Sequence, residues 1–166
     1  MSKILISTLL LLIATPVYAA GLYIEQLRVT LTPLPDGSFL VEETYRYDAR
    51  RTATSTVHQR VVDLAPPEPS RSPLMQRHVE LQEPQLQAGD EVIPVDVTLD
   101  KATAQITWEI STTTPLHTLS YRIVGGLSYP RQGEAELVWS ATGIHEGTFI
   151  RSVAVTLAGD EELQRG

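Results

Sequence analysis

The sequence predicts an all-β protein, an antiparallel β-sandwich of the immunoglobulin-like or a related kind with about nine strands. Apolar residues recur with a period of two rather than 3.6, which is typical of half-buried strands and not of helices. Turn-forming stretches separate these runs at short intervals, at 35–37, 64–73, 87–91, 99–103, 125–133 and 141–147, as expected for a sandwich. A closed barrel is the alternative arrangement for such strands.

The first two strands are predicted to form an antiparallel hairpin. Leu27, Val29 and Leu31 alternate with polar residues, and a Pro-Asp-Gly turn follows at 35–37, where glycine supplies the positive φ. The return strand, 39–47, again alternates. Further strands are predicted at 57–64, 76–82, 91–99, 104–110, 117–124, 134–140 and 148–157.

Successive side chains of a strand point to opposite faces, so the alternation also predicts the core. Three large aromatic residues, Trp108, Tyr121 and Trp139, are predicted to be core residues. The predicted inward rows are Val95, Val97 and Leu99; Ile106, Trp108 and Ile110; Leu119, Tyr121 and Ile123; Ala135, Leu137 and Trp139; and Val153, Val155 and Leu157. Gly125–Gly126 then marks a bulge or a strand exit.

The N-terminus has the features of a secretory signal. Lys3 precedes an apolar run at 4–14, and small residues follow at Val17 and Ala19, which predicts a signal-peptide helix over 1–19 and cleavage after Ala19. The apolar run is shorter than the ~20 residues of a membrane-spanning helix. We therefore expect an exported protein, periplasmic or extracellular, with a sandwich domain over 20–157, a flexible tail over 158–166 and no transmembrane segment after signal removal.

Composition excludes several classes of function. The chain has a formal net charge of −7 and no cysteine. Nucleic-acid binding needs a concentrated positive face, and no basic cluster exceeds Arg50–Arg51. The four histidines, His58, His78, His117 and His145, are all more than five residues apart, a spacing that favours no zinc site. We expect no disulfide, no cofactor and no nucleic-acid partner.

No motif indicates catalysis. No Gly-x-Ser-x-Gly elbow occurs. Glu42 and Glu43 are adjacent, so they point to opposite faces of a strand and cannot act as a carboxylate pair. Exposed aromatic residues for sugar binding are few, with Tyr23, Tyr129 and Phe149 as the candidates.

One carboxylate and one arginine break the apolar pattern of their strands. Glu43 shares a face with Val41 and Tyr45, and Arg60 shares a face with Val62. A lone buried carboxylate is costly, so it should be protonated or paired. We predict that Glu43 and Arg60 form a structural pair across the sandwich or at its rim; the alternative is that Glu43 lies at a sheet edge and reaches water.

The order of several short motifs resembles a known family. Residues 36–47 ("DGSFLVEETYRY"), 58–62 ("HQRVV") and the runs from 121 to 157 ("YRIVGG", "AELVWSATG", "FIRSVAVTL") are similar to the extracytoplasmic N-terminal β-rich domain of a domain-of-unknown-function family of bacterial predicted membrane proteins. In that family transmembrane helices follow the domain, whereas nothing hydrophobic follows Leu157 here. Glu43 and Arg60 fall where the family pattern has Glu and Arg, and the resemblance implies no catalytic residues.

Two functional hypotheses remain. The first is a non-enzymatic binding or interaction module that contacts an unknown envelope protein. The second is an exported hydrolase or carbohydrate-binding module with a site built from loops.

Overall fold

The computed structural model describes a chain made of strands. The described residues are 22–51, 57–65, 79–100, 102–110, 114–131, 134–137, 139–140 and 148–158. Their strands are β1 (Leu22–Pro33), β2 (Phe39–Tyr47), β3 (Val57–Asp63), β4 (Glu80–Ala88), β5 (Glu91–Ile93), β6 (Asp96–Asp100), β7 (Thr103–Glu109), β8 (Leu116–Val124), β9 (Leu127–Arg131), β10 (Glu134–Leu137), β11 (Thr148–Ile150) and β12 (Val153–Leu157).

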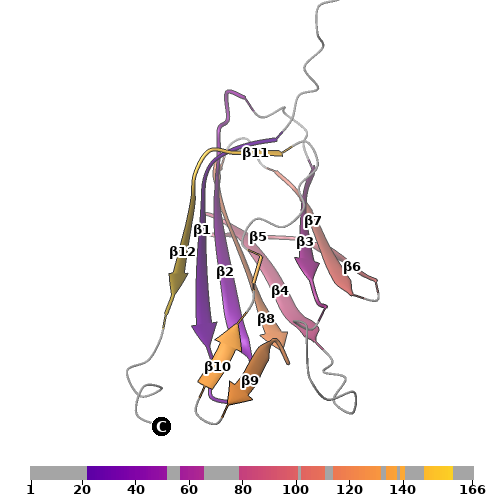
Figure 1. The fold of residues 1–166 in the computed structure, drawn as a ribbon. Coiled ribbons are helices and arrows are strands. Elements are labelled where there is room, and N and C mark those ends of the chain that lie inside the picture. Colours follow the sequence, from indigo (N-terminus) through magenta and orange to yellow (C-terminus); the bar gives the residue numbers. More distant parts are fainter. Residues whose placement is uncertain are drawn as a thin grey trace, which may run out of the picture.

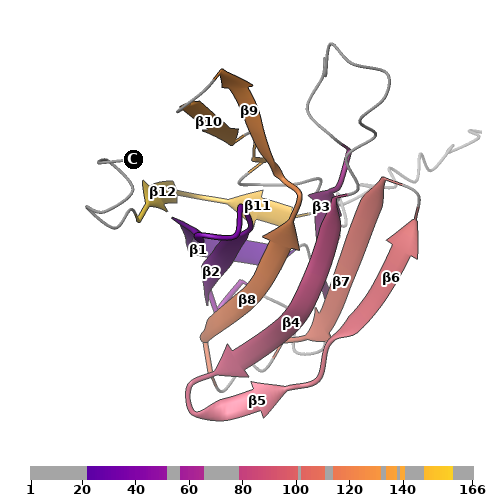
Figure 2. The same cartoon turned by 90° about the horizontal axis from the view of Figure 1, so that it is seen from below.

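These strands form a seven-stranded sheet, a three-stranded sheet and a two-stranded hairpin. The large sheet has the order β11-β1-β2-β8-β4-β5, with β12 also paired to β1; the small sheet is β3-β7-β6, and the hairpin is β9-β10. Strands β3, β7 and β6 form a layer of their own beside the large sheet (Figure 1), and β5 carries the chain from β4 into β6 (Figure 2).

The inner faces of the two sheets pack on each other, so the predicted β-sandwich is confirmed. Tyr45 of β2 lies 5.6 Å from Trp108 of β7, measured between ring centroids. Both side chains belong to one apolar cluster with the buried rows of β1, β2, β7 and β8. Burying large apolar side chains of this kind contributes ~1.5–3 kcal/mol each, which is the main stabilisation available without disulfides.

The predicted first hairpin is present. β1 pairs antiparallel with β2, and Gly37 takes the positive φ of 80° that the turn requires. The Asp36 carboxylate accepts hydrogen bonds from the backbone N–H and the hydroxyl of Ser38, at 3.1 and 2.6 Å. Arg122 of β8 also donates to Ser38 Oγ and to Asp36, which ties the turn to the next strand of the sheet.

Several strands differ from the prediction. The strands predicted at 91–99 and 148–157 are each divided in two, as β5 and β6 and as β11 and β12. β4 occupies 80–88 rather than 76–82, because a register shift between Gln82 and Gln85 allows Pro84 to lie within a strand. Glu83 has a positive φ of 53° at this shift, and a bulge is one of the few positions where a strand tolerates proline. β9 lies in the stretch 125–133, which was predicted to be a turn.

Two predicted core rows are wrong except at Val95, which is partly buried against the core. Val97 and Leu99 of β6 are 39% and 65% exposed, and Val153, Val155 and Leu157 of β12 are 42–65% exposed. Their side chains have the predicted parity, since Val97 is paired with the buried Ile106 and Val155 with the buried Val29. Both strands lie at the outer edge of a sheet, where the opposing layer does not cover them.

The large sheet also contains parallel pairs at one edge, which the sequence pattern did not predict. β11 and β12 both run parallel to β1, at Leu22–Ile24 and Leu27–Leu31 respectively. A parallel pair requires a long crossover connection, and here nearly the whole chain lies between the partners.

The predicted signal over 1–19 and most of the predicted tail lie outside the described residues, and both stay predictions. Across the part of the chain that the structure describes, no helix is long and apolar enough to span a bilayer.

Candidate functional site

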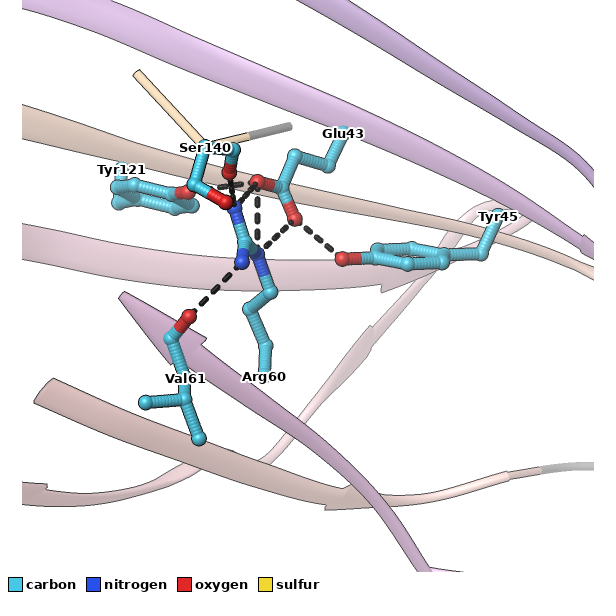
Figure 3. A network of polar contacts seen from close by, with 6 residues as sticks. All are labelled: Glu43, Tyr45, Arg60, Val61, Tyr121 and Ser140. Carbon is cyan, nitrogen blue, oxygen red and sulfur yellow. Dashed lines mark hydrogen bonds and ion pairs between the residues drawn. The ribbon is translucent and has the colours of Figure 1, made fainter. Parts of the chain in front are cut away.

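A network of ionisable groups lies in the core between the two sheets (Figure 3). Glu43 comes from β2 and Arg60 from β3. Each occupies an inward position of an alternating strand, and both side chains are at most 1% exposed. β2 lies between β1 and β8, so Glu43 is not at a sheet edge and does not reach water.

Arg60 meets the carboxylate with two of its nitrogens. Its Nε lies 3.0 Å from both Glu43 oxygens, and its Nη2 lies 2.8 Å from Oε1. The remaining donors reach backbone carbonyls: Nη1 donates to Val61 O and Nη2 to Ser140 O, both at 2.8 Å. The planar guanidinium suits this geometry because its donors form a fixed fork.

Two tyrosines complete the shell of the carboxylate. Tyr121 of β8 donates to Glu43 Oε1 at 2.7 Å, and the Tyr45 hydroxyl donates to Oε2. Both Glu43 oxygens therefore accept from one arginine and one tyrosine. Charge-assisted bonds of this kind are about twice as strong as neutral ones, and they offset the cost of removing the carboxylate from water.

The network holds Arg60, Tyr45 and Tyr121 each in one protonation state. Burial raises the pKa of Tyr45 and of Tyr121 well above the usual value of 10, and the negative charge of Glu43 adds to this. For Arg60, burial disfavours the charged form, but the adjacent Glu43 carboxylate outweighs this and the pKa is raised above its usual value. The arginine thus stays charged and both tyrosines stay neutral at physiological pH.

A second buried group continues the network along the same strands. Tyr47 of β2 shares a hydrogen bond with His58 Nδ1, and His58 packs against Trp108 with ring centroids 4.3 Å apart. His117 of β8 packs edge-on against Tyr47 at 5.0 Å. Both ring nitrogens of His117 lack a hydrogen-bond partner among the described residues, and burial lowers the pKa of His117 below 6.5.

Sequence reasoning missed this histidine-containing group. The histidines attract attention in the sequence as possible metal ligands, and His117 also as a histidine near the hydroxyl residues 111–114, but not as core residues. The described residues contain no cluster of three or more metal-binding side chains. The signal was present, because His58 has the same strand parity as Arg60, and His117 has the same parity as Tyr121. His78 and His145 lie outside the described residues.

The predicted core aromatic residues all lie near the network. Trp108 and Tyr121 are 3% and 1% exposed. Trp139 is partly buried against the core. Its ring lies 5.9 Å from that of Tyr121 and 5.7 Å from Arg60 Cζ, so it covers the network on one side.

A separate group of side chains lies on the surface, at the start of β1. Tyr23 and Phe149 are register partners on β1 and β11, and their rings stack with centroids 4.9 Å apart. Arg51 lies over the Tyr23 ring at 4.7 Å. Phe149 is 56% exposed and the Arg51 side chain 63%. We call Tyr23, Arg51 and Phe149 the aromatic patch. Tyr129, the third aromatic residue that the sequence offers as a candidate for sugar binding, lies outside the described side chains.

The two groups have different chemical capacities. The Glu43 carboxylate is surrounded by its own donors and is 0% exposed, so it has no free position for a substrate or for water, both of which a general acid or base must contact. The aromatic patch presents an exposed aromatic side chain, Phe149, and an exposed arginine, Arg51, and aromatic residues and arginine are enriched at binding surfaces.

Comparisons with known proteins agree with the sequence resemblance. Among curated proteins, no sequence matches the chain. One solved structure, an M1 zinc metallopeptidase mutant from Deinococcus radiodurans bound to a Tyr-Ser-Ala substrate, is similar over 69% of this chain and 22% of its own, with 13% identity and a TM-score of 0.35. A similarity this low supports no conclusion about the fold or function of this chain. A family model matches residues 23–164, and the chain therefore belongs to the family described as "Predicted membrane protein (DUF2207) N-terminal domain".

Proposed function

We propose that this domain is a non-enzymatic, exported interaction module that binds a protein partner in the cell envelope through the aromatic patch. The observation that carries the proposal is the exposed Phe149 ring, which stacks on the half-buried Tyr23 beside Arg51. Single exposed apolar residues are common on protein surfaces, but a stacked aromatic pair with an arginine has the composition of an interface hot spot.

The core network supports the non-enzymatic part of the proposal. Glu43 and Arg60 satisfy each other and are closed off by Tyr45, Tyr121 and the partly buried Trp139. Their role is then structural: they fix how the small sheet docks on β2. A buried ionic group in this role selects one packing arrangement rather than adding much stability.

The secretory features of residues 1–19 and the family description support a location outside the cytoplasm. We infer that the domain lies in the periplasm or outside the cell. Gel analysis and mass spectrometry of the protein isolated from the envelope fraction would test this, with a mature N-terminus at Ala20 as the expected result. Retention of residue 1 in a cytoplasmic pool would contradict it.

Affinity capture from solubilised envelope tests the binding surface. The immobilised wild-type protein is compared with Phe149→Ala and with the matched control Leu99→Ala, whose side chain is apolar and 65% exposed on β6 of the other sheet. We expect one protein to be retained by the wild type and by the control and to be lost with Phe149→Ala. Equal retention by all three would overturn the proposal.

One observation favours a second candidate, a carbohydrate-binding module. The Phe149 side chain is 56% exposed, and aromatic side chains are common in ligand sites. Co-sedimentation with purified cell-wall polysaccharide separates the two functions. Binding that is lost in Phe149→Ala would favour the carbohydrate module, and release of reducing sugar would add a hydrolase activity.

A further inference from the structure

Strand β12 exposes an apolar row that belongs to the inner face of the sandwich. Its register pairs Val153 with Leu27, Val155 with Val29 and Leu157 with Leu31. Cross-strand partners share a face of the sheet, and the three β1 partners are at most 6% exposed. The β12 side chains point to the same side, yet they are 42%, 54% and 65% exposed. The core thus ends in an uncovered edge.

The backbone of the same strand has free hydrogen-bonding groups. Leu27 N donates to Ser152 O at 2.9 Å, and Ala158 N donates to Leu31 O at 2.8 Å. In a parallel ladder alternate residues bond to the same neighbour, so the even positions of β12 face β1. The N–H and C=O groups of 153, 155 and 157 then point away from β1, toward an edge that no strand pairs within the described ranges.

This edge lacks the usual protection against pairing. Natural edge strands carry lysine, proline, inward charges or bulges that prevent another strand from adding. The sequence of β12, "VAVTL", has no charged residue, no proline and no glycine, and three of its five residues are β-branched. Such a strand is suited to accept a further strand rather than to remain in water.

We propose that β12 pairs with β12 of a second copy of this chain, antiparallel and about a two-fold axis at Val155. In this register Val155 faces Val155 of the second copy and Val153 faces Leu157. The outward-pointing backbone groups of both strands then meet in hydrogen-bonded pairs, about six bonds in all. The two exposed apolar rows become cross-strand neighbours, which stabilises such pairs further.

The charges around β12 favour this orientation. Arg151 precedes the strand, and Asp160, Glu161 and Glu162 follow it in the sequence. Antiparallel pairing places the beginning of each strand, which a basic residue precedes in the sequence, beside the end of the other, which acidic residues follow in the sequence. Parallel pairing of two copies would place like charges together, which is destabilising. A self-complementary contact is also what a two-fold axis requires.

Five residues per strand make a small contact. Interfaces at the low end of the size range are weak and transient, so we expect a dissociation constant on the order of micromolar. The dimer should therefore appear in a concentration series by sedimentation equilibrium, at tens of micromolar protein and not at nanomolar concentration.

Single cysteines test the register, because the chain has no cysteine of its own. Val155→Cys places two thiols on directly opposed residues, ~5.5 Å apart between Cα atoms, within the range for a disulfide. We expect a covalent dimer under mild oxidation. The matched control is Leu157→Cys, on the same face and also exposed. Its two copies are displaced by four residues, roughly 14 Å along the strand, and should not cross-link, whereas a mixture of Val153→Cys and Leu157→Cys should.

Charge substitution gives an independent test that does not depend on oxidation. Val155→Lys alone should weaken the dimer by about tenfold or more, because two ammonium groups would face each other. Mixing Val155→Lys with Val155→Glu should restore association. Circular dichroism should be unchanged in both variants, since the side chain is already 54% exposed.

Three results would overturn the proposal. The first is a wild-type protein that stays monomeric up to roughly hundreds of micromolar, well above the expected dissociation constant. The second is cross-linking of Leu157→Cys as efficient as that of Val155→Cys. The third is a mixture of Val155→Lys and Val155→Glu that does not recover dimer formation. Capture of a different protein by a β12 edge that does not self-associate would also count against it.

Discussion

Removing one side of the Glu43–Arg60 pair should destabilise the sandwich far more than removing an exposed ion pair. Arg60→Met leaves the carboxylate with only the hydroxyls of Tyr45 and Tyr121, and Glu43→Gln leaves the guanidinium beside a neutral amide. Both side chains are at most 1% exposed, so water cannot replace the lost partner. Breaking a buried pair from one side typically costs ~3–5 kcal/mol.

The double variant isolates the interaction itself. It removes both charges at once, so the unfolding free energy should fall by less than the sum of the two single changes. With ~4 kcal/mol for each single change, a double variant that costs about the same as one of them gives a coupling energy of roughly 4 kcal/mol. That is a large fraction of the ~5–15 kcal/mol of a whole domain.

Urea unfolding followed by tryptophan fluorescence measures all three variants. Trp139 lies 5.7 Å from Arg60 Cζ, so its emission reports on the network directly. Arg122→Met is the matched control, because Arg122 also pairs with a carboxylate, that of Asp36, but at the surface. Its loss of unfolding free energy should be much smaller. Single changes below about 1 kcal/mol that simply add would refute the energetic coupling between Glu43 and Arg60.

Three further predictions follow from the same core. Tyr121→Phe removes one donor to the Glu43 carboxylate and should cost ~1.5–3 kcal/mol in the same urea assay; a change under about 0.5 kcal/mol would contradict that bond. Burial lowers the pKa of His117, so below pH 6.5 the unfolded chain binds a proton that the folded chain does not, and stability should fall as pH decreases. Urea midpoints should show this slope in the wild type and less of it in His117→Phe, and equal slopes would refute it. In Gly126→Ala the new Cβ would lie 2.5 Å from a Phe39 ring carbon. We therefore expect the free energy of unfolding to fall by ~1–3 kcal/mol, with a lower thermal midpoint. An unchanged midpoint would contradict this and show that the Phe39 ring moves freely.

The sequence contained enough to place the central part of the fold. Period-two alternation located β2, β7 and β8 within one or two residues, because these strands have one buried face and one exposed face and so display the full pattern. Glu43 could be singled out for the same reason: a charged residue is conspicuous only where its neighbours on the same face are consistently apolar.

Other features depend on which elements meet, and a local pattern does not contain that information. Val155 and Leu99 have the parity of core residues, but whether an opposing layer covers them is decided by the sheet order. The parallel pairing of β12 with β1 is equally non-local. The strand predicted at 76–82 stops before Pro84, and only the register shift between Gln82 and Gln85 shows how a strand continues through this proline.

The pairing of β1 with β12 also has a consequence for how the chain folds. Leu27 and Val153 are register partners although 126 positions separate them (153 − 27). Ribosomes add residues from the N-terminus at about 5–20 per second. Strand β12 is therefore synthesised several seconds after β1. Non-local pairing of this kind also slows folding itself, because the entropy cost of closing the long loop comes before the contacts that offset it. During that interval one side of β1 is open to other strands. We therefore expect the chain to remain incompletely folded until synthesis is nearly finished, a state compatible with passage through a narrow export channel and one that exposes it to proteases and chaperones.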